Sequence, residues 1–435
     1  MNPLALELNN QLIKENPALY EVLSARGKAL FFPKGILTQS AEAKVKAKKF
    51  NATIGIATEH GVAMHLPCIK KHIETIPPND AFTYAPAAGK AELRSTWQEK
   101  LLAQNPGLKG KHFSLPVVTS AITHGLSLVG DLFVEEGDVM VLPDKLWGNY
   151  RLIFNVRLGA TLKTFPLYNE KNGFNSKGLQ KVLDETVQVK QKIIILLNFP
   201  NNPTGYSITP QEADAIVTVL KDCASRGARL IIVHDDAYFG LFYDDALMKE
   251  SLFALTANLH ERILAIKLDG ATKEQYVWGL RVGFITYGIG GGANKEVIYG
   301  ALEKKTMGAI RGGISNSPHL SQTLVLRAME SKEFAAERKA KHEIMKTRAL
   351  KVKEVLANKK YDDAWTYYPF NSGYFMCLQL KSVNAEALRQ HLLARYEVGV
   401  ISVDATDVRI AFSCIEARDI QELFDIIYQG VKDLS

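Results

Sequence analysis

The stretch IIILLNFPNNPTG at residues 193–205 combines two features that together indicate the fold. Its first five residues are continuously apolar and rich in isoleucine, which is typical of a strand buried on both faces of a sheet. The eight residues that follow contain two prolines and a glycine, so they favour a rigid turn directly after the strand. The asparagines of this turn carry amides that can point at a ligand.

Similar short apolar runs recur along the middle of the chain. They lie at residues 117–119, 139–142, 230–233, 263–266 and 281–286. Helix-like stretches separate most of them, and the clearest are 124–136 and 210–227. Strands that alternate with helices predict an α/β fold whose mostly parallel sheet lies between helices. In such sheets ligands bind beyond the carboxyl ends of the strands, so the residues after each run are the candidates for a site.

The last hundred residues follow a different pattern. Residues 333–360 read as one long charged helix with Met345, Val352 and Leu356 on one stripe, and the strand-like pieces SGYFMCLQL and DVRIAFS come after it. This order predicts a smaller α+β domain. We therefore expect three parts: an N-terminal segment (1–62) that packs with the small domain, a large domain (63–332) and the C-terminal small domain (333–435).

Composition narrows the class of protein. The 435 residues are too many for one core, and the net charge of +7 is spread along the chain, which argues against a nucleic-acid partner. The four cysteines are far apart, so we expect neither disulfides nor a metal site. The sequence shows no secretory signal and no apolar run of membrane-span length. We expect a cytoplasmic protein without a membrane partner.

Chemically distinctive side chains follow the predicted strands. SAITHGL at 120–126 opens a helix whose start is suited to an anion, and LWGNY at 146–150 places an aromatic ring at a strand end. HDDAYFG at 234–240 supplies acids and a phenol, and ATKEQYVWGLRVGF at 271–284 holds a lysine and, eight residues later, an arginine. Each feature alone has a structural explanation as a turn, a helix cap or core filler. The candidates are Thr123, Trp147, Asn202, Asp235, Tyr238, Lys273 and Arg281.

Taken together, these groups match the requirements of pyridoxal phosphate. Its aldehyde needs a lysine for a Schiff base, and its phosphate needs a helix N-terminus and an arginine. Its ring needs a flat stacking partner, and its pyridine nitrogen needs a carboxylate.

With these residues, the chain resembles the fold-type-I, pyridoxal-phosphate-dependent class I/II aminotransferases, most closely the aspartate and aromatic branch. The resemblance extends from about residue 50 to 415. The resemblance implies that residues 63–332 form the cofactor-binding domain. Lys273 matches the Schiff-base lysine, and Arg281, flanked by Gly279 and Gly283, matches the arginine on the cofactor phosphate.

Other roles follow from the same resemblance. Asp235 matches the pyridine-nitrogen carboxylate and Tyr238 the phenol near the ring oxygen. Trp147 matches the stacking aromatic, which also borders the substrate. Asn202 matches the asparagine that hydrogen-bonds the ring hydroxyl oxygen and borders the substrate. The phosphate-binding turn corresponds to Ala121, Ile122 and Thr123.

The substrate and subunit contacts are also implied by the resemblance. Arg409 in DVRIAFS matches the arginine that grips the substrate α-carboxylate. Tyr84 in FTYAPAAGKAELR matches a tyrosine that reaches the phosphate of the neighbouring subunit. Arg311 in IRGGISNSP matches an arginine that the partner subunit supplies to a side-chain carboxylate. We therefore expect a homodimer with composite active sites.

Three positions depart from the family pattern. Gly270 replaces a serine that usually contacts phosphate, a contact that Thr272 could replace. Asp269 is unusual for a position beside a phosphate. Tyr150 stands where the aspartate branch often has a histidine behind the ring-nitrogen carboxylate. These departures mark a divergent member of the family.

The implied activity is a ping-pong transamination between an L-amino acid, expected to be aspartate or glutamate, and a 2-oxo acid. Alternatives on the same fold are an aromatic or other aminotransferase, or a lyase or decarboxylase. A regulator of transcription would need an N-terminal DNA-binding domain, and residues 1–60 are too short for one and lack a helix-turn-helix pattern.

Overall fold

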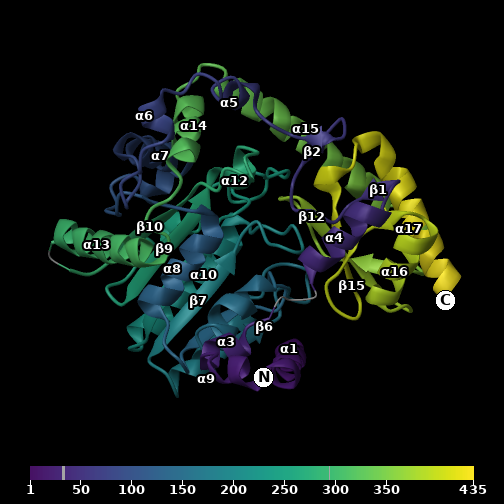
Figure 1. The fold of residues 1–435 in the computed structure, drawn as a ribbon, viewed down its shortest axis with the longest axis horizontal. Coiled ribbons are helices and arrows are strands. Elements are labelled where there is room, and N and C mark those ends of the chain that lie inside the picture. The colour runs from purple at the N-terminus through teal and green to yellow at the C-terminus, as the bar shows by residue number, and fades with distance from the viewer. Residues whose placement is uncertain (32–34, 293) are drawn as a thin grey trace.

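The computed structural model describes residues 1–31, 35–292 and 294–435 (Figure 1). Its largest sheet has seven strands in the order β4-β10-β9-β8-β7-β5-β6. Neighbouring strands are parallel, except that β10 runs antiparallel to both β4 and β9. The strands are β4 (Val117–Thr119), β5 (Val139–Pro143), β6 (Thr161–Phe165), β7 (Lys192–Asn198), β8 (Arg229–Asp235), β9 (Ile263–Gly270) and β10 (Gly283–Ile289).

The apolar runs explain why this sheet is buried on both sides. In β7, Ile194 and Leu196 belong to one buried hydrophobic cluster, whereas Ile193, Ile195 and Leu197 belong to another. Successive side chains of a strand point to opposite faces, so a continuous apolar run is what two covered faces require. The mostly parallel sheet between helices was thus predicted correctly.

Helices surround this sheet. The predicted helices at 124–136 and 210–227 are present as α8 (Ala121–Phe133) and α10 (Pro210–Ser225), the second begun by a capping box between Thr209 and Glu212. The other helices in this part are α5 (Pro67–Lys70), α6 (Pro78–Ala81), α7 (Ala91–Gln104), α9 (Ser176–Val187), α11 (Phe253–Thr256), α12 (Ala271–Glu274), α13 (Lys295–Gly313) and α14 (His319–Met329).

A second, antiparallel sheet lies in the C-terminal part, on the right of Figure 1. Its order is β11-β12-β15-β14, and the long helix α15 packs against α17 beside it. The elements are α15 (Phe334–Leu356), β11 (Trp365–Tyr367), β12 (Phe375–Leu380), α16 (Ala385–Arg395), β14 (Ile401–Ser402), β15 (Asp407–Ala411) and α17 (Ile420–Leu434).

The N-terminal residues contribute to more than one region. β1 (Phe50–Asn51) pairs in parallel with β13 (Val398–Gly399), and α4 (Ile36–Lys46) contacts β13, β14 and α16. Of the earlier helices, α1 (Pro3–Glu15) contacts both α2 (Pro17–Glu21) and α3 (Ala25–Ala29). Figure 1 shows α1 and α3 apart from α16 and α17. The division of the chain at residues 62 and 332 stays a prediction.

Three further observations complete the fold. The four cysteines are free. Within the described ranges, the search finds no cluster of three or more His, Cys, Asp or Glu side chains that could hold a metal ion. Among the helices of these same ranges, none combines the length and the apolar character that crossing a bilayer demands.

Candidate active site

A cleft of about 320 Å³ opens beyond the carboxyl ends of the central strands. It is bordered by residues that follow β4, β5, β7, β8 and β9, together with residues of the C-terminal part. The predicted site residues that line it are Ile122, Thr123, Trp147, Asn202, Asp235, Tyr238, Thr272, Lys273, Arg281 and Arg409. Its volume is in the range of small-molecule sites.

Lys273 lies on α12, the single helical turn that follows β9. Its Nζ atom is 4.7 Å from the centroid of the Tyr238 ring. Burial lowers the pKa of this amine to about 8; the nearby Asp235 carboxylate opposes that shift and the Arg281 guanidinium adds to it. A substantial fraction of the amine is therefore unprotonated in mildly alkaline solution, as a nucleophile or a base requires.

Asp235 ends β8 and is almost fully buried. Its carboxylate accepts a hydrogen bond from the Tyr150 hydroxyl at 2.6 Å and another from the Ala237 N–H at 3.1 Å. Burial raises the pKa of Asp235, while the Tyr150 hydroxyl and the Lys273 amine oppose that shift. Tyr150 also meets the Trp147 ring edge-on, with ring centroids 5.5 Å apart, so the same tyrosine orients both groups.

Arg409 is a buried cation on the other side of the cleft. Its guanidinium donates to the Asn202 Oδ1 atom at 3.1 Å and to the Thr53 carbonyl at 2.8 Å, and it lies 4.1 Å from the centroid of the Phe375 ring. Among the described residues, no carboxylate pairs with it, and its Nε atom has no hydrogen-bond partner. Because a buried charge is costly without an opposite charge, this position favours an anionic ligand.

A third region of the cleft is shaped to hold an anion. Helix α8 starts without a side-chain cap, so the first-turn N–H groups are available to a ligand. A Cβ atom on Gly283 would lie 2.8 Å from the Ala121 backbone, so only glycine lets β10 approach this turn. The hydroxyl of Thr272 is buried and, in the part of the chain that the structure describes, has no partner. With Arg281 on the same cleft, these groups suit a phosphate.

Gly270 departs from the family pattern for a local reason. A Cβ atom there would lie 2.6 Å from the Val282 carbonyl oxygen and 2.8 Å from the Gly283 Cα atom. A serine is therefore excluded by the backbone that pairs with the end of β9. Thr272, two residues later, lines the cleft instead.

Sequence reasoning missed an apolar wall. Its members are Ile36, Ile54, Ile56, Trp278 and Phe375. The three isoleucines come from a segment that precedes the central sheet, and no motif marks them. Trp278 lies inside the lysine–arginine stretch, where an aromatic residue between two predicted site residues was a usable signal. Its buried indole N–H has no partner among the described residues.

Three predicted residues do not line the cleft. Ala121 is buried behind it, against Gly283. Tyr84 is 88% exposed, and Arg311 is exposed at the end of α13, where it donates to the Ser315 hydroxyl at 2.6 Å. The segment that carries Tyr84 is tied to α14 by a 2.8 Å hydrogen bond from the Thr323 hydroxyl to the Asp80 carbonyl.

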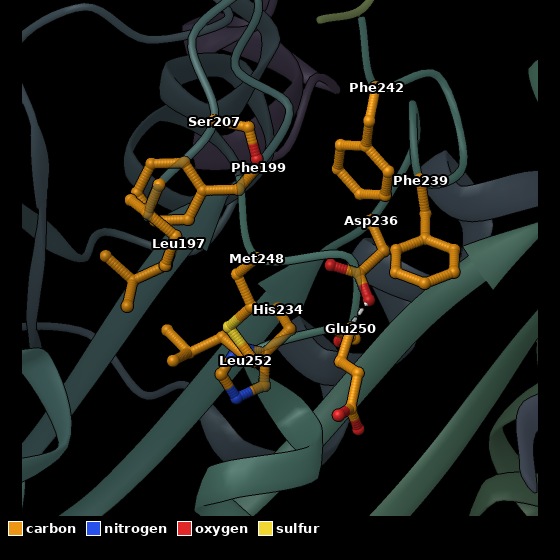
Figure 2. A pocket seen from close by; sticks show the side chains of 12 residues that line it. Leu197, Phe199, Ser207, His234, Asp236, Phe239, Phe242, Met248, Glu250 and Leu252 are labelled. Atoms are coloured by element: carbon orange, nitrogen blue, oxygen red, sulfur yellow. Dashed lines mark hydrogen bonds between the residues drawn. The ribbon is translucent and has the colours of Figure 1, made fainter. Parts of the chain in front are cut away.

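A separate internal void lies at the end of β8, next to His234 and Asp236 (Figure 2). Figure 2 shows Asp236 beside the rings of Phe239 and Phe242, with His234 and Glu250 on the same void. Its volume of about 10 Å³ is enough for roughly one water molecule. The void is too small for a substrate, so the candidate active site is the larger cleft around Lys273.

Comparisons with known proteins point to one family. The family model described as "Aminotransferase class I and II" matches residues 57–427. A curated relative from Escherichia coli (strain K12), "Aromatic-amino-acid aminotransferase", is 24% identical over 84% of this chain and 91% of its own length. "Probable aspartate/prephenate aminotransferase" of Aquifex aeolicus (strain VF5) is 29% identical, but the match spans 46% of this chain and only about half, 48%, of that protein.

A solved structure shares the whole fold. The crystal structure of an aminotransferase from Anaerococcus prevotii superposes with a TM-score of 0.84 over 94% of this chain and 99% of its own. Its sequence identity is 22%, so the likeness concerns the fold alone.

Proposed function

Because this chain belongs to the class I and II aminotransferases, we propose that it transfers an amino group from an L-amino acid to a 2-oxo acid in a ping-pong cycle. The observation that carries the proposal is the meeting, in one cleft, of an amine with a lowered pKa (Lys273), a buried carboxylate (Asp235) and a buried arginine without a carboxylate partner among the described residues (Arg409).

Pyridoxal phosphate, the cofactor of this family, supplies an aldehyde for a bond to an amine and a ring that accepts electrons. The cleft fits it, since the start of α8 against Gly283 and the Thr272 hydroxyl, which has no partner among the described residues, are suited to its phosphate. The residues that would hold it are Lys273, Asp235, Tyr238, Asn202, Trp147, Ile122, Thr123, Thr272 and Arg281.

Lys273 would move the proton of the reaction. Its amine, with a pKa of about 8, can accept the proton that leaves the substrate α-carbon. It can then donate that proton again later in the same half-reaction. Asp235 would stay ionised because Tyr150 and Ala237 donate hydrogen bonds to it, and it would keep a facing ring nitrogen protonated. Arg409 would hold the substrate α-carboxylate beside Asn202.

For the substrate side chain we propose a dicarboxylic acid, held by Arg311 of a second copy of this chain. Tyr84 and Arg311 are both exposed, which suits groups that act across a homodimer interface. The apolar wall of Ile36, Ile54 and Ile56 favours a second candidate, an aromatic or aliphatic amino acid.

The test is a visible spectrum of the purified protein during titration with single amino acids, with Lys273→Ala as the control. We expect aspartate or glutamate to bleach the cofactor band and 2-oxoglutarate to restore it, with neither change in the variant. If only aromatic or aliphatic amino acids act, the second candidate holds. If no cofactor band forms, the proposed function is wrong.

A further inference from the structure

The helix that carries Lys273 is one turn long, so its position depends on contacts around it. A four-residue turn such as α12 has no stability of its own. The Ala271 N–H donates to the Val282 carbonyl at 3.1 Å, and the Tyr374 hydroxyl donates to the Lys273 carbonyl at 3.0 Å. The end of the turn is held by the side chain of Glu274, which is 7% exposed.

Glu274 connects this turn to two other helices. One carboxylate oxygen accepts from the Lys100 amine at 2.7 Å, and the other accepts from the Gln104 amide at 2.7 Å and from the Arg338 guanidinium. Lys100 and Gln104 lie on α7, whereas Arg338 lies on α15 of the C-terminal part. Burial alone would raise the pKa of Glu274, but Lys100 and Arg338 hold it below its usual value.

This carboxylate lies on the opposite side of α12 from the candidate active site. Lys273 lines the 320 Å³ cleft, whereas Glu274 lines a second cavity of about 370 Å³ with Arg338 and Gln104. Glu274 therefore cannot touch a ligand in the cleft, and any effect on the reaction has to pass through the turn.

The contacts of Glu274 continue as a buried chain of charges. Lys100 lies 4.2 Å from the centroid of the Trp97 ring, and the Trp97 indole donates to Asp269 at 3.1 Å. Asp269 lies 3.6 Å from the Lys267 amine, which also pairs with Asp236. Asp236 directly follows Asp235 in sequence, just as Glu274 follows Lys273. This chain of charges thus lies immediately behind Asp235 and Lys273, the carboxylate and the amine of the cleft.

From these contacts we propose that Glu274 is a positioning residue for Lys273, and that Arg338 links this position to α15. The proposal rests on the transaminase function proposed above. Without its charge, Glu274 would leave Lys100 and Arg338 without their shared anion, and α12 would lose its connection to both helices. A small displacement of the Lys273 amine from its proton-transfer position is costly for the rate.

The experiment compares holoenzyme variants in a single half-reaction. In Glu274→Gln, we expect the maximal rate of band bleaching by the amino donor to fall roughly 10- to 100-fold, as for misplaced catalytic groups. The donor concentration that gives half the maximal rate should stay within about threefold, because Arg409 is unchanged. Visible circular dichroism per unit absorbance should change, because it reports the orientation of the bound cofactor.

Lys341→Met is the matched control. Lys341 also lies on α15, but its ion pair, at 2.6 Å, is with Glu59 in the N-terminal part and not with a residue of α12. This variant should keep both the rate and the dichroism of the wild type. If Glu274→Gln lowers the melting temperature but keeps the wild-type rate and dichroism, Glu274 is merely structural. If Glu274→Gln does not fold, Arg338→Met decides, since its side chain is about one-third exposed. The absence of a cofactor band in the wild type would instead refute the proposed function.

Discussion

Tyr150→Phe tests whether the tyrosine behind Asp235 keeps that carboxylate ionised. The substitution removes only the hydroxyl that donates to Asp235 at 2.6 Å, and leaves the Ala237 N–H as the remaining donor within the described residues. A hydrogen bond to a charged group contributes about 1.5–3 kcal/mol, and one pKa unit corresponds to about 1.4 kcal/mol. The pKa of Asp235, which burial already raises, should therefore rise by roughly one to two further units.

The assay is the pH profile of kcat/KM for the amino donor, which reports groups of the free holoenzyme. If the reaction needs Asp235 ionised, the acid limb of this pH profile should move to higher pH by the same one to two units.

The raised pKa of Asp235 should also change how the free energy of unfolding of the apo-protein depends on pH. A raised folded-state pKa gives stability below the unfolded pKa that is lost as pH rises through the folded pKa. The variant should therefore lose more stability than the wild type at mildly alkaline pH.

Tyr206→Phe is the matched control. It removes a hydroxyl that donates to the Glu212 carboxylate at 2.7 Å, from a tyrosine that is buried outside the cleft. This variant should lose stability without a shift of the acid limb. An unchanged acid limb in Tyr150→Phe, or an equal shift in both variants, would refute the reasoning.

Three other substitutions test the remaining parts of the site. Arg409→Met should lower kcat/KM by roughly 10²- to 10³-fold, since it removes a buried partner of the substrate carboxylate. Calorimetry of the apo-protein should show equal or higher stability, because the variant lacks a buried charge that has no carboxylate partner in the described part of the chain. Arg311→Ala should lower kcat/KM for aspartate at least about 30-fold and spare an aromatic donor; equal losses would make Arg311 structural. Gly270→Ser should lower the free energy of unfolding in denaturant by about 1–3 kcal/mol, because the new Cβ atom would lie 2.6 Å from the Val282 oxygen. A variant that binds the cofactor more tightly and is as stable as the wild type would contradict this explanation.

Much of the fold follows from short-range patterns in the sequence. The six apolar runs all correspond to strands, because a strand covered on both faces needs apolar residues on both. The strand β6 (Thr161–Phe165) was missed, since it lies at the edge of the sheet and only Leu162 and Phe165 of its five residues are apolar. The antiparallel direction of β10 was also not predicted, because the sequence pattern of a run does not record its direction.

The candidate site was predictable where its residues directly follow strands. Thr123, Trp147, Asn202, Asp235 and Lys273 were found in this way, because the fold brings the carboxyl ends of parallel strands to one edge. The apolar wall was not predictable, since its isoleucines precede the central sheet and meet Trp278 and Phe375 only through tertiary contacts. The sequence also could not show that Glu274, next to Lys273, faces away from the cleft; only the structure shows this.

Two of the three positions that depart from the family pattern, Asp269 and Gly270, have structural explanations that lie outside the cleft. Asp269, which is unexpected beside a phosphate, belongs to the buried chain of charges and accepts from the Trp97 indole. Gly270 is required by the close approach of the Val282 carbonyl, so the turn into α12 begins without a side chain. In the segment 269–274, Asp269 and Glu274 thus belong to the charged chain, whereas Thr272 and Lys273 between them line the cleft. With the function proposed above, Glu274 would hold Lys273 from outside the cleft, whereas Thr272 would make the phosphate contact that Gly270 cannot make.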